Sequence, residues 1–135
     1  MFAFFLVVVS TLAVMQWTRR IPNIATVKVI GVDIYKDINF TVAVTQIDWG
    51  IVEPGKSKNF SAYIVNRSNV PITLGMTTES WNPASASDFI TLTWTYDGAE
   101  IPVNGYILAT FALSVDHAIS GIDGFSFTIV IVGSG

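Results

Sequence analysis

The 135-residue chain contains no cysteine and a single histidine, His117. The missing cysteines exclude disulfide bonds and the sites in which thiolates hold zinc, copper or an iron–sulfur cluster. One histidine excludes a pair of histidine metal ligands, and a Ser-His-Asp arrangement would have to use His117. We therefore expect no cofactor, and an exported domain of this size must rely on core packing for its stability.

Charge is also scarce in this sequence. Charged residues make up 13% of the chain, whereas about 25% is usual in soluble domains. The formal net charge is -3, and there is no run of basic residues. Proteins that bind nucleic acids need Lys and Arg for phosphate contacts, so nucleic acid is not an expected partner. The surface is expected to be neutral and rich in Ser, Thr and Asn.

The first 18 residues carry no charged side chain, and Arg19 and Arg20 follow them directly. A helix of this length would rise about 27 Å, close to the roughly 30 Å thickness of the hydrocarbon core of a membrane. No basic residue precedes the apolar run and no small-x-small cleavage site ends it, which favours a retained anchor over a cleaved signal peptide. Membrane lipid is thus the expected partner of residues 1–18, with Trp17, Arg19 and Arg20 at the membrane interface.

The two arginines and the glycosylation motifs make opposite predictions about the side of the membrane. Basic residues after an apolar segment favour a cytoplasmic body. Three Asn-x-Ser/Thr motifs, which begin at Asn39, Asn59 and Asn66, predict glycosylation and favour export. A start codon assigned too late, with a basic segment lost upstream, would remove the conflict. Because the composition of the body also favours export, we expect a cell-membrane protein with an extracellular domain, or a secreted one.

The rest of the chain has the pattern of short β-strands. Beyond Pro22, apolar and polar residues alternate, and turn-forming Pro, Gly and Asn residues separate the runs. Strands are predicted at residues 25–35, with a bulge at Gly31, and at residues 40–47, 56–65, 72–78, 89–96, 101–103, 106–115 and 125–132. The predicted regions are an anchor or signal at residues 1–20, a stalk at 21–24 and one β-sandwich domain at 25–135.

Seven or eight short strands without helical periodicity predict an all-β fold, an antiparallel sandwich with immunoglobulin-like topology. One N-terminal apolar helix would precede it. An up-and-down barrel is the alternative. Within the strand pattern, Trp49 and Trp94 are predicted to be core aromatics.

Residues 47–74 carry a set of turn and loop residues found together in known domains. The matching positions are Trp49-Gly50, Pro54-Gly55, Asn66, Asn69 and Pro71. This pattern resembles that of small immunoglobulin-like exported or scaffold domains. With the apolar head, the whole chain is similar to short archaeal single-pass secreted β-sandwich proteins and, more distantly, to the TasA and camelysin group, which includes subunits of extracellular fibres. The resemblance specifies a fold well and a function poorly, because the Asn side chains of the pattern stabilise a loop and the Pro opens the next strand.

No group of residues carries a catalytic or metal-binding pattern. His117 follows Asp116 in a loop and is expected to be exposed to solvent. Asp116 with Asp123, or Asp33 with Asp37, would supply oxygen ligands for Ca²⁺, but neither pair has the alternating ligand spacing of an EF-hand. The acidic residues fall mainly in turns, whereas a glycosidase needs two on the floor of a cleft. We predict that the chain is not an enzyme and holds no metal.

Two functions remain from the sequence. The first is structural: the sandwich associates through strand edges into a filament or surface layer, with residues 25–35 or 126–132 as the associating segments. In the alternative arrangement, both segments pair within one chain. The second function is that of a monomeric ectodomain that binds a glycan or protein ligand through Trp81, although a Trp before Asn-Pro more often packs on the end of a core.

Overall fold

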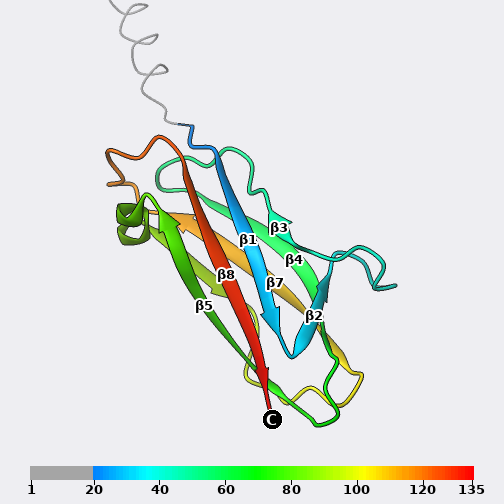
Figure 1. Ribbon diagram of the computed structural model, residues 1–135. Helices are drawn as coiled ribbons and strands as arrows, with labels where there is room; N and C mark the ends of the chain where they lie inside the picture. The colour runs from blue at the N-terminus through cyan, green and yellow to red at the C-terminus, as the bar shows by residue number, and fades with distance from the viewer. Residues whose placement is uncertain (1–19) are drawn as a thin grey trace, which may run out of the picture.

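The computed structural model describes residues 20–135, so the predicted N-terminal helix, the membrane segment 1–18, Trp17 and Arg19 lie outside the described residues. Within the described part of the chain, no helix is long and apolar enough to cross a membrane. The strands are β1 (Asn23–Ile30), β2 (Val32–Tyr35), β3 (Gln46–Ile47), β4 (Ser57–Asn66), β5 (Thr73–Asn82), β6 (Ile90–Trp94), β7 (Tyr106–Val115) and β8 (Phe125–Ser134) (Figure 1). A short 3-10 helix, η1 (Ala84–Asp88), joins β5 to β6.

The strands form two four-stranded sheets, with the orders β3-β1-β8-β5 and β2-β4-β7-β6. The prediction of an all-β sandwich with about eight strands is confirmed. The pairing of β1 with β8 is parallel, from Asn23 opposite Phe125 to Ile30 opposite Val132, and every other pair of neighbouring strands is antiparallel. The last strand therefore lies inside the first sheet, between β1 and β5.

The predicted strand at residues 25–35 is in fact two strands, one in each sheet. Gly31 separates them and has a φ of 77°, a conformation that glycine adopts without steric cost. A Cβ at Gly31 would lie 3.1 Å from the carbonyl oxygen of Gly133, so the space also favours glycine. Gly31 is therefore the point where the chain crosses between sheets, and the prediction of a bulge was wrong.

Two other predicted segments are less regular than their patterns suggested. Of residues 40–47, only Gln46–Ile47 forms a strand, and of 101–103 only Ile101 makes an isolated bridge. Within the first segment, the Val44 amide donates to the Ile34 carbonyl at 2.9 Å, and the Thr45 carbonyl accepts from Val27 at 2.8 Å. These bonds tie the segment first to one sheet and then to the other, which closes this side of the sandwich.

The residues before β1 are part of the folded domain. Ile21 is buried, and it exchanges two backbone hydrogen bonds with Val52, at 2.8 and 3.1 Å. β1 then begins at Asn23. Residues 21–24 thus belong to the sandwich and do not form a separate stalk.

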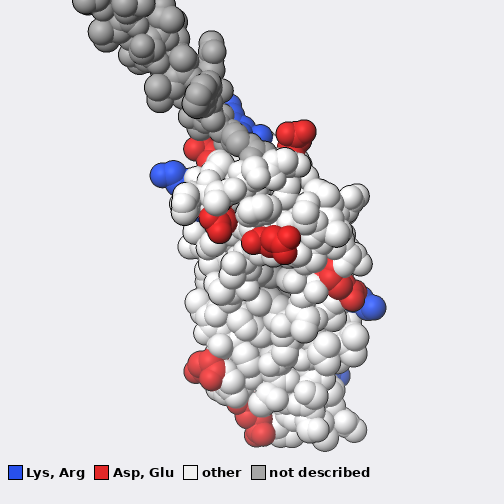
Figure 2. All heavy atoms as spheres, turned by 90° about the vertical axis from the view of Figure 1, so that its left-hand side faces the viewer, with Lys and Arg blue, Asp and Glu red and all other residues white. Residues whose placement is uncertain are grey.

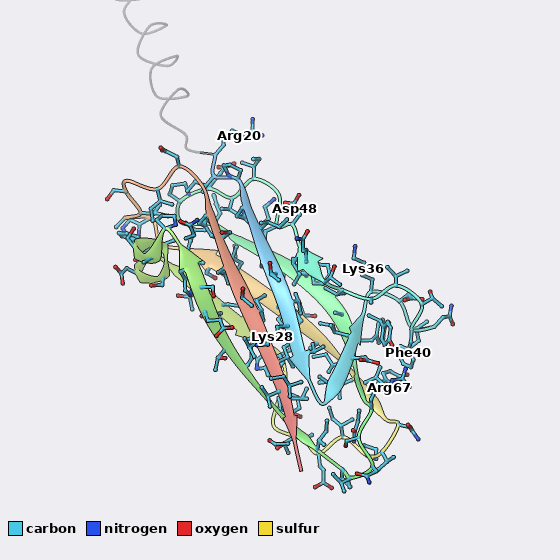
Figure 3. All side chains as sticks on the ribbon, viewed as in Figure 1. Arg20, Lys28, Lys36, Phe40, Asp48 and Arg67 are labelled. Carbon is cyan, nitrogen blue, oxygen red and sulfur yellow. The ribbon has the colours of Figure 1, made fainter. Side chains whose placement is uncertain are left out.

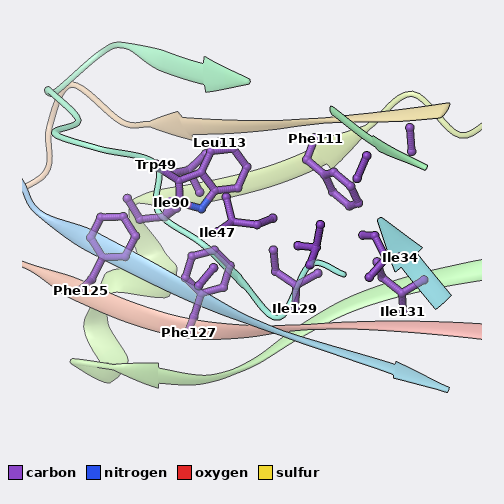
Figure 4. Close-up of a cluster of buried hydrophobic side chains, with 14 of the residues drawn as sticks. Ile34, Ile47, Trp49, Ile90, Phe111, Leu113, Phe125, Phe127, Ile129 and Ile131 are labelled. Atoms are coloured by element: carbon purple, nitrogen blue, oxygen red, sulfur yellow. The ribbon is translucent and has the colours of Figure 1, made fainter. Parts of the chain in front are cut away.

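The core lies between the two sheets and is built from their inward-facing side chains. Along β8, alternate side chains from Phe125 to Ile131 are buried, which is the period of a strand, and Val130 on the other face is buried as well. Trp49 is 5% exposed, and Trp94 is half-buried against Phe111 with a ring-centroid distance of 5.8 Å. Trp49 is thus a core aromatic, as predicted, whereas Trp94 is partly buried and packs against the core. Figure 4 shows the central side chains, among them Ile34, Ile47, Ile90, Leu113, Phe125, Phe127, Ile129 and Ile131.

Candidate interaction surfaces

The residues considered for catalysis and metal binding do not come together. The His117 side chain is 90% exposed, and its Nδ1 lies 3.4 Å from an oxygen of Asp116. Asp33 pairs with Arg67, while Asp37 accepts hydrogen bonds from its own loop. Among residues 20–135, no group of three or more acidic or histidine side chains could hold a metal ion. These residues act locally, in turns and in one ion pair.

Two hollows in the surface also contain no paired carboxylates. The larger, of about 260 Å³, is lined by residues 51, 53 and 56–58, of which Glu53 is the acid. The smaller, of about 200 Å³, lies beside β1 and β2 and contains Asp33 as its acid. A glycosidase needs two carboxyl groups across one cleft. Neither hollow meets that requirement.

Trp81 lies half-buried near the end of β5 and packs against the core. Its ring stacks on Phe127 with a centroid distance of 4.2 Å and an interplanar angle of 6°. Its Nε1 donates to the Thr78 hydroxyl at 3.2 Å. One face of the indole is therefore occupied by Phe127, and a ligand would meet only the remainder of the ring.

The three predicted glycosylation sites have different environments. Asn39 and Asn59 are exposed. Asn66 is 0% exposed, and its amide nitrogen donates to three backbone carbonyl groups at 2.8 to 3.2 Å. A glycan on that nitrogen would displace these bonds and has no space in the folded domain. Asn39 and Asn59 are the acceptors that the fold leaves accessible.

Both segments that were predicted to associate between copies pair within the chain. β8, which contains residues 126–132, lies between β1 and β5. β1 in turn pairs with β8 along its whole length and with β3 at Ala25 and Thr26. The rest of the segment 25–35 is β2, an edge strand whose outer side bonds to residues 42 and 44. The structure thus has the alternative arrangement, in which both segments pair within one chain. The sequence alone did not reveal this because the partner of β8 comes from the opposite end of the chain.

The outer edge of β5 is protected at its beginning. Ile72 and Ile101 exchange two backbone hydrogen bonds, at 3.1 and 2.8 Å. The Leu74 amide then donates to the Tyr96 hydroxyl at 3.1 Å. Because Tyr96 follows β6, this bond also fixes β5 and β6 on the same side of the sandwich.

Further along, β5 and β6 are the last strands of their sheets, and no other strand within residues 20–135 pairs with their outer sides. Alternate residues of a strand direct their N–H and C=O groups to opposite sides. Because Ile72 and Leu74 form their hydrogen bonds on the outer side of β5, the backbone N–H and C=O groups of Met76 and Thr78 also point to that open side. The Thr95 amide donates to the Thr110 carbonyl of β7. By the same alternation, the backbone N–H and C=O groups of Leu92 and Trp94 point to the open side of β6. We call Met76 to Thr78 and Leu92 to Trp94 together the β5–β6 edge.

The β5–β6 edge is uncharged and partly apolar. The side chains of Met76, Leu92 and Trp94 are half-buried against the core. Figure 2 shows this side of the molecule with few charges, most of them acidic and widely spaced. A register shift between Glu79 and Asn82 ends the regular pairing of β5 at its far end. On the opposite side of the sandwich, residues 42–47 bond to both sheets and connect them, whereas the β5–β6 edge has no such connecting segment among the described residues.

A second surface, missed in the sequence, lies on the outer face of the β2-β4-β7-β6 sheet. We call Tyr35, Phe40, Tyr63 and Tyr106 the aromatic patch. Ring centroids are 5.5 Å apart for Phe40 and Tyr35, 5.4 Å for Phe40 and Tyr106, and 5.9 Å for Tyr63 and Tyr106. Leu108 lies opposite Tyr63 in the sheet and is 52% exposed. The sequence did contain a signal for this surface, because each tyrosine alternates with the core-facing residues of its strand and is therefore expected on the outer face.

A compact turn holds Phe40 in the aromatic patch. Phe40 has a φ of 58°, which is rare and strained for a bulky residue. Its amide donates to the Asp37 carbonyl at 3.1 Å. The Asp37 carboxylate accepts from the Thr41 amide at 3.0 Å, from the Val42 amide at 2.9 Å and from the Thr41 hydroxyl. These bonds, that of the Thr41 side chain first, lower the pKa of Asp37.

Arg67 and Asp33 flank the aromatic patch. The guanidinium carbon of Arg67 lies 6.0 Å from the centre of the Tyr35 ring, and its Nε lies 3.2 Å from Asp33 Oδ2. The Tyr35 hydroxyl donates to the same oxygen at 3.1 Å. Phe40 and Arg67 lie on the same side of the molecule, beyond β2 (Figure 3). The patch thus has one acid and one base at its border.

Acid is expected to loosen the Phe40 turn. Because the folded-state pKa of Asp37 is lowered, its stabilising contribution is complete above the ordinary aspartate pKa of about 3.9. It is lost as the pH falls through the lower folded value. NMR titration should show the Thr41 and Val42 amide protons moving upfield at that pH, and Asp37→Ala should show the change at neutral pH. Unchanged amide shifts in Asp37→Ala would contradict this account.

Comparison with known proteins adds no relative. No protein-family model matches the chain, and no curated protein matches it.

Proposed function

We propose that this protein is a non-enzymatic structural protein of the cell surface, an immunoglobulin-like sandwich that associates with further copies through a strand edge. It would be held at the membrane by an N-terminal helix, or exported. The uncharged run of residues 1–18 supports the location. The observation that carries the proposed association is the β5–β6 edge.

Free strand edges pair readily with other strands, and proteins that must stay monomeric usually block them with Lys, Pro or bulges. β5 contains neither Lys nor Pro, and Glu79 is its one charged residue. Its register shift lies between Glu79 and Asn82, beyond the Met76 to Thr78 stretch. Two copies with antiparallel β5 strands would satisfy the backbone groups of Met76 and Thr78 and cover the half-buried Met76 side chain. The small net charge of -3 would oppose this contact only weakly.

The proposal predicts that Met76→Pro prevents association and that Met76→Leu does not. Proline removes an N–H that faces the open side, so the bonds of β5 to β8 remain. A symmetric contact loses two such bonds, each worth about 0.5 to 1.5 kcal/mol, and the association constant should fall about tenfold or more. Sedimentation of the full chain in mild detergent, over a range of protein concentrations, measures this.

Circular dichroism and thermal unfolding show whether Met76→Pro keeps the fold, and Met76→Leu controls for the changed side chain. Wild-type protein that stays monomeric at every concentration would contradict the proposed function. So would an equal association constant for the folded Pro and Leu variants.

A further inference from the structure

The β5–β6 edge alone does not produce a filament or a layer. When two copies pair β5 with β5 around a two-fold axis, both edges are used and the assembly closes as a dimer. On the opposite side of the sandwich, residues 42–47 bond to Val27 of β1 and to Ile34 and Lys36 in and after β2. An extended structure therefore needs a second contact surface on each copy.

We infer that the aromatic patch is this second surface, and that it binds the aromatic patch of another copy around a second two-fold axis. This inference rests on the proposed function. Exposed aromatic residues are enriched at protein interfaces, where a few large side chains carry most of the binding energy. Tyr106 is 49% and Leu108 52% exposed. The strain of Phe40 favours a specific role for its ring, because a glycine or asparagine would hold the same turn with less strain.

The size of the patch suits the centre of such an interface. An aromatic side chain has about 150 to 250 Å² of surface, so four partly buried rings with Leu108 offer about 300 Å². Stable interfaces bury about 800 Å² on each partner, and the surroundings must supply the rest. The same sheet face continues into paired hydroxyls, Ser61 with Thr110 at 2.8 Å and Ser57 with Ser114 at 3.0 Å. An aromatic centre with a neutral polar rim is the usual composition of an interface.

The charges at the border suit a copy of the same surface. Arg67 and Asp33 are adjacent, with side chains 45% and 47% exposed. A two-fold axis near them would place Arg67 of each copy opposite Asp33 of the other. A surface with charges of one sign would repel its own copy, whereas this pair is complementary to itself.

The ring orientations favour another protein surface over a sugar. Phe40 meets Tyr106 at 69°, and Tyr63 meets Tyr106 at 62°. The rings therefore present edges and faces at different tilts and do not form a flat platform for stacked sugar rings. Tilted rings can interdigitate with the same set of rings in edge-to-face contacts.

The absence of cysteine makes a direct test possible, since each introduced thiol is unique. Leu108→Cys marks the aromatic patch, Thr77→Cys marks β5, and Ser120→Cys marks an exposed loop as the control. Each full-length variant, in membranes of the expressing cells, is treated with a short bis-maleimide. Leu108→Cys and Thr77→Cys should each give covalent dimers, the variant with both should give a ladder of larger species, and Ser120→Cys should stay monomeric.

A charge exchange tests the two-fold contact. Arg67→Asp places like charges opposite each other and should lower the yield of the Leu108→Cys dimer about tenfold. Adding Asp33→Arg should restore the yield, because the exchanged pair is again complementary.

The outcomes separate the two proposals. If Thr77→Cys forms dimers and Leu108→Cys does not, the edge contact stands and the aromatic patch is not an interface between copies. If neither forms dimers, the proposed function fails as well. If soluble oligosaccharides protect Leu108→Cys from labelling in the absence of dimers, the patch binds sugar and the inference is overturned.

Discussion

Replacement of Asn66 by aspartate is expected to unfold the domain at neutral pH. The Asn66 amide nitrogen donates to the carbonyls of Val70, Ile101 and Pro102, at 2.8, 3.0 and 3.2 Å. Its oxygen accepts from the Ser68 amide at 2.8 Å and from the Ser68 hydroxyl at 2.7 Å. These bonds tie the loop after β4 to residues 101 and 102. An ionised aspartate has the same shape but donates nothing, and it would direct a negative charge at three carbonyl oxygens.

The expected loss is comparable with the whole stability of the domain. Each buried polar group left without its partner costs about 1 to 3 kcal/mol, and an unpaired buried charge costs several more. Domains of this size are stable by about 5 to 15 kcal/mol. The loss of the two-sheet core should be visible in circular dichroism of the full chain.

Asn69→Asp is the matched control, because it makes the same substitution three positions later at an exposed residue. Its melting temperature should change by no more than a few degrees, since surface substitutions are usually within about 0.5 kcal/mol. Partial recovery of Asn66→Asp at acidic pH is also expected, because burial raises the pKa of an aspartate and the protonated form regains one donor. A variant at Asn66 that melts within a few degrees of wild type would contradict this role.

Strands whose two faces differ were predicted best from the sequence. The prediction of 106–115 matches β7 (Tyr106–Val115), and 56–65 differs by one residue at each end from β4 (Ser57–Asn66). In β7, and in β4 as far as Ile64, buried residues alternate with exposed or half-buried ones, which fixes strand and face together. The alternation in residues 40–47 was misleading, because Val44 is buried in a crossing segment that bonds to the two sheets in turn.

The interaction surfaces were harder to predict, because each depends on contacts distant in sequence. A strand pattern predicts that a segment pairs with other strands, but it does not show which strand lies at the edge of a sheet. Residues 126–132 have the composition of an aggregation-prone edge strand, yet they lie inside the first sheet. The less hydrophobic β5 is the edge strand of that sheet. The aromatic patch likewise joins β2, β4, β7 and a turn. Tyr35 and Tyr63 alternate with core residues in their strands, but alternation does not show that the two side chains lie close together.

Phe111→Ala is expected to cause the largest loss of stability among the core substitutions. Phe111 is 0% exposed and lies opposite Phe60 of β4 on one side and Trp94 of β6 on the other. Removing its ring leaves a cavity at the centre of the second sheet. A Phe to Ala change in a core costs about 3 to 5 kcal/mol, so the midpoint of urea unfolding should fall strongly with little change in slope.

Leu108→Ala is the control, because it removes an aliphatic side chain from the same strand on the opposite face. Leu108 is 52% exposed, so its loss should change stability by about 0.5 kcal/mol or less. The comparison also tests the register of β7. A shift of one residue would exchange the two faces of the strand, and Leu108→Ala would then be the more damaging change.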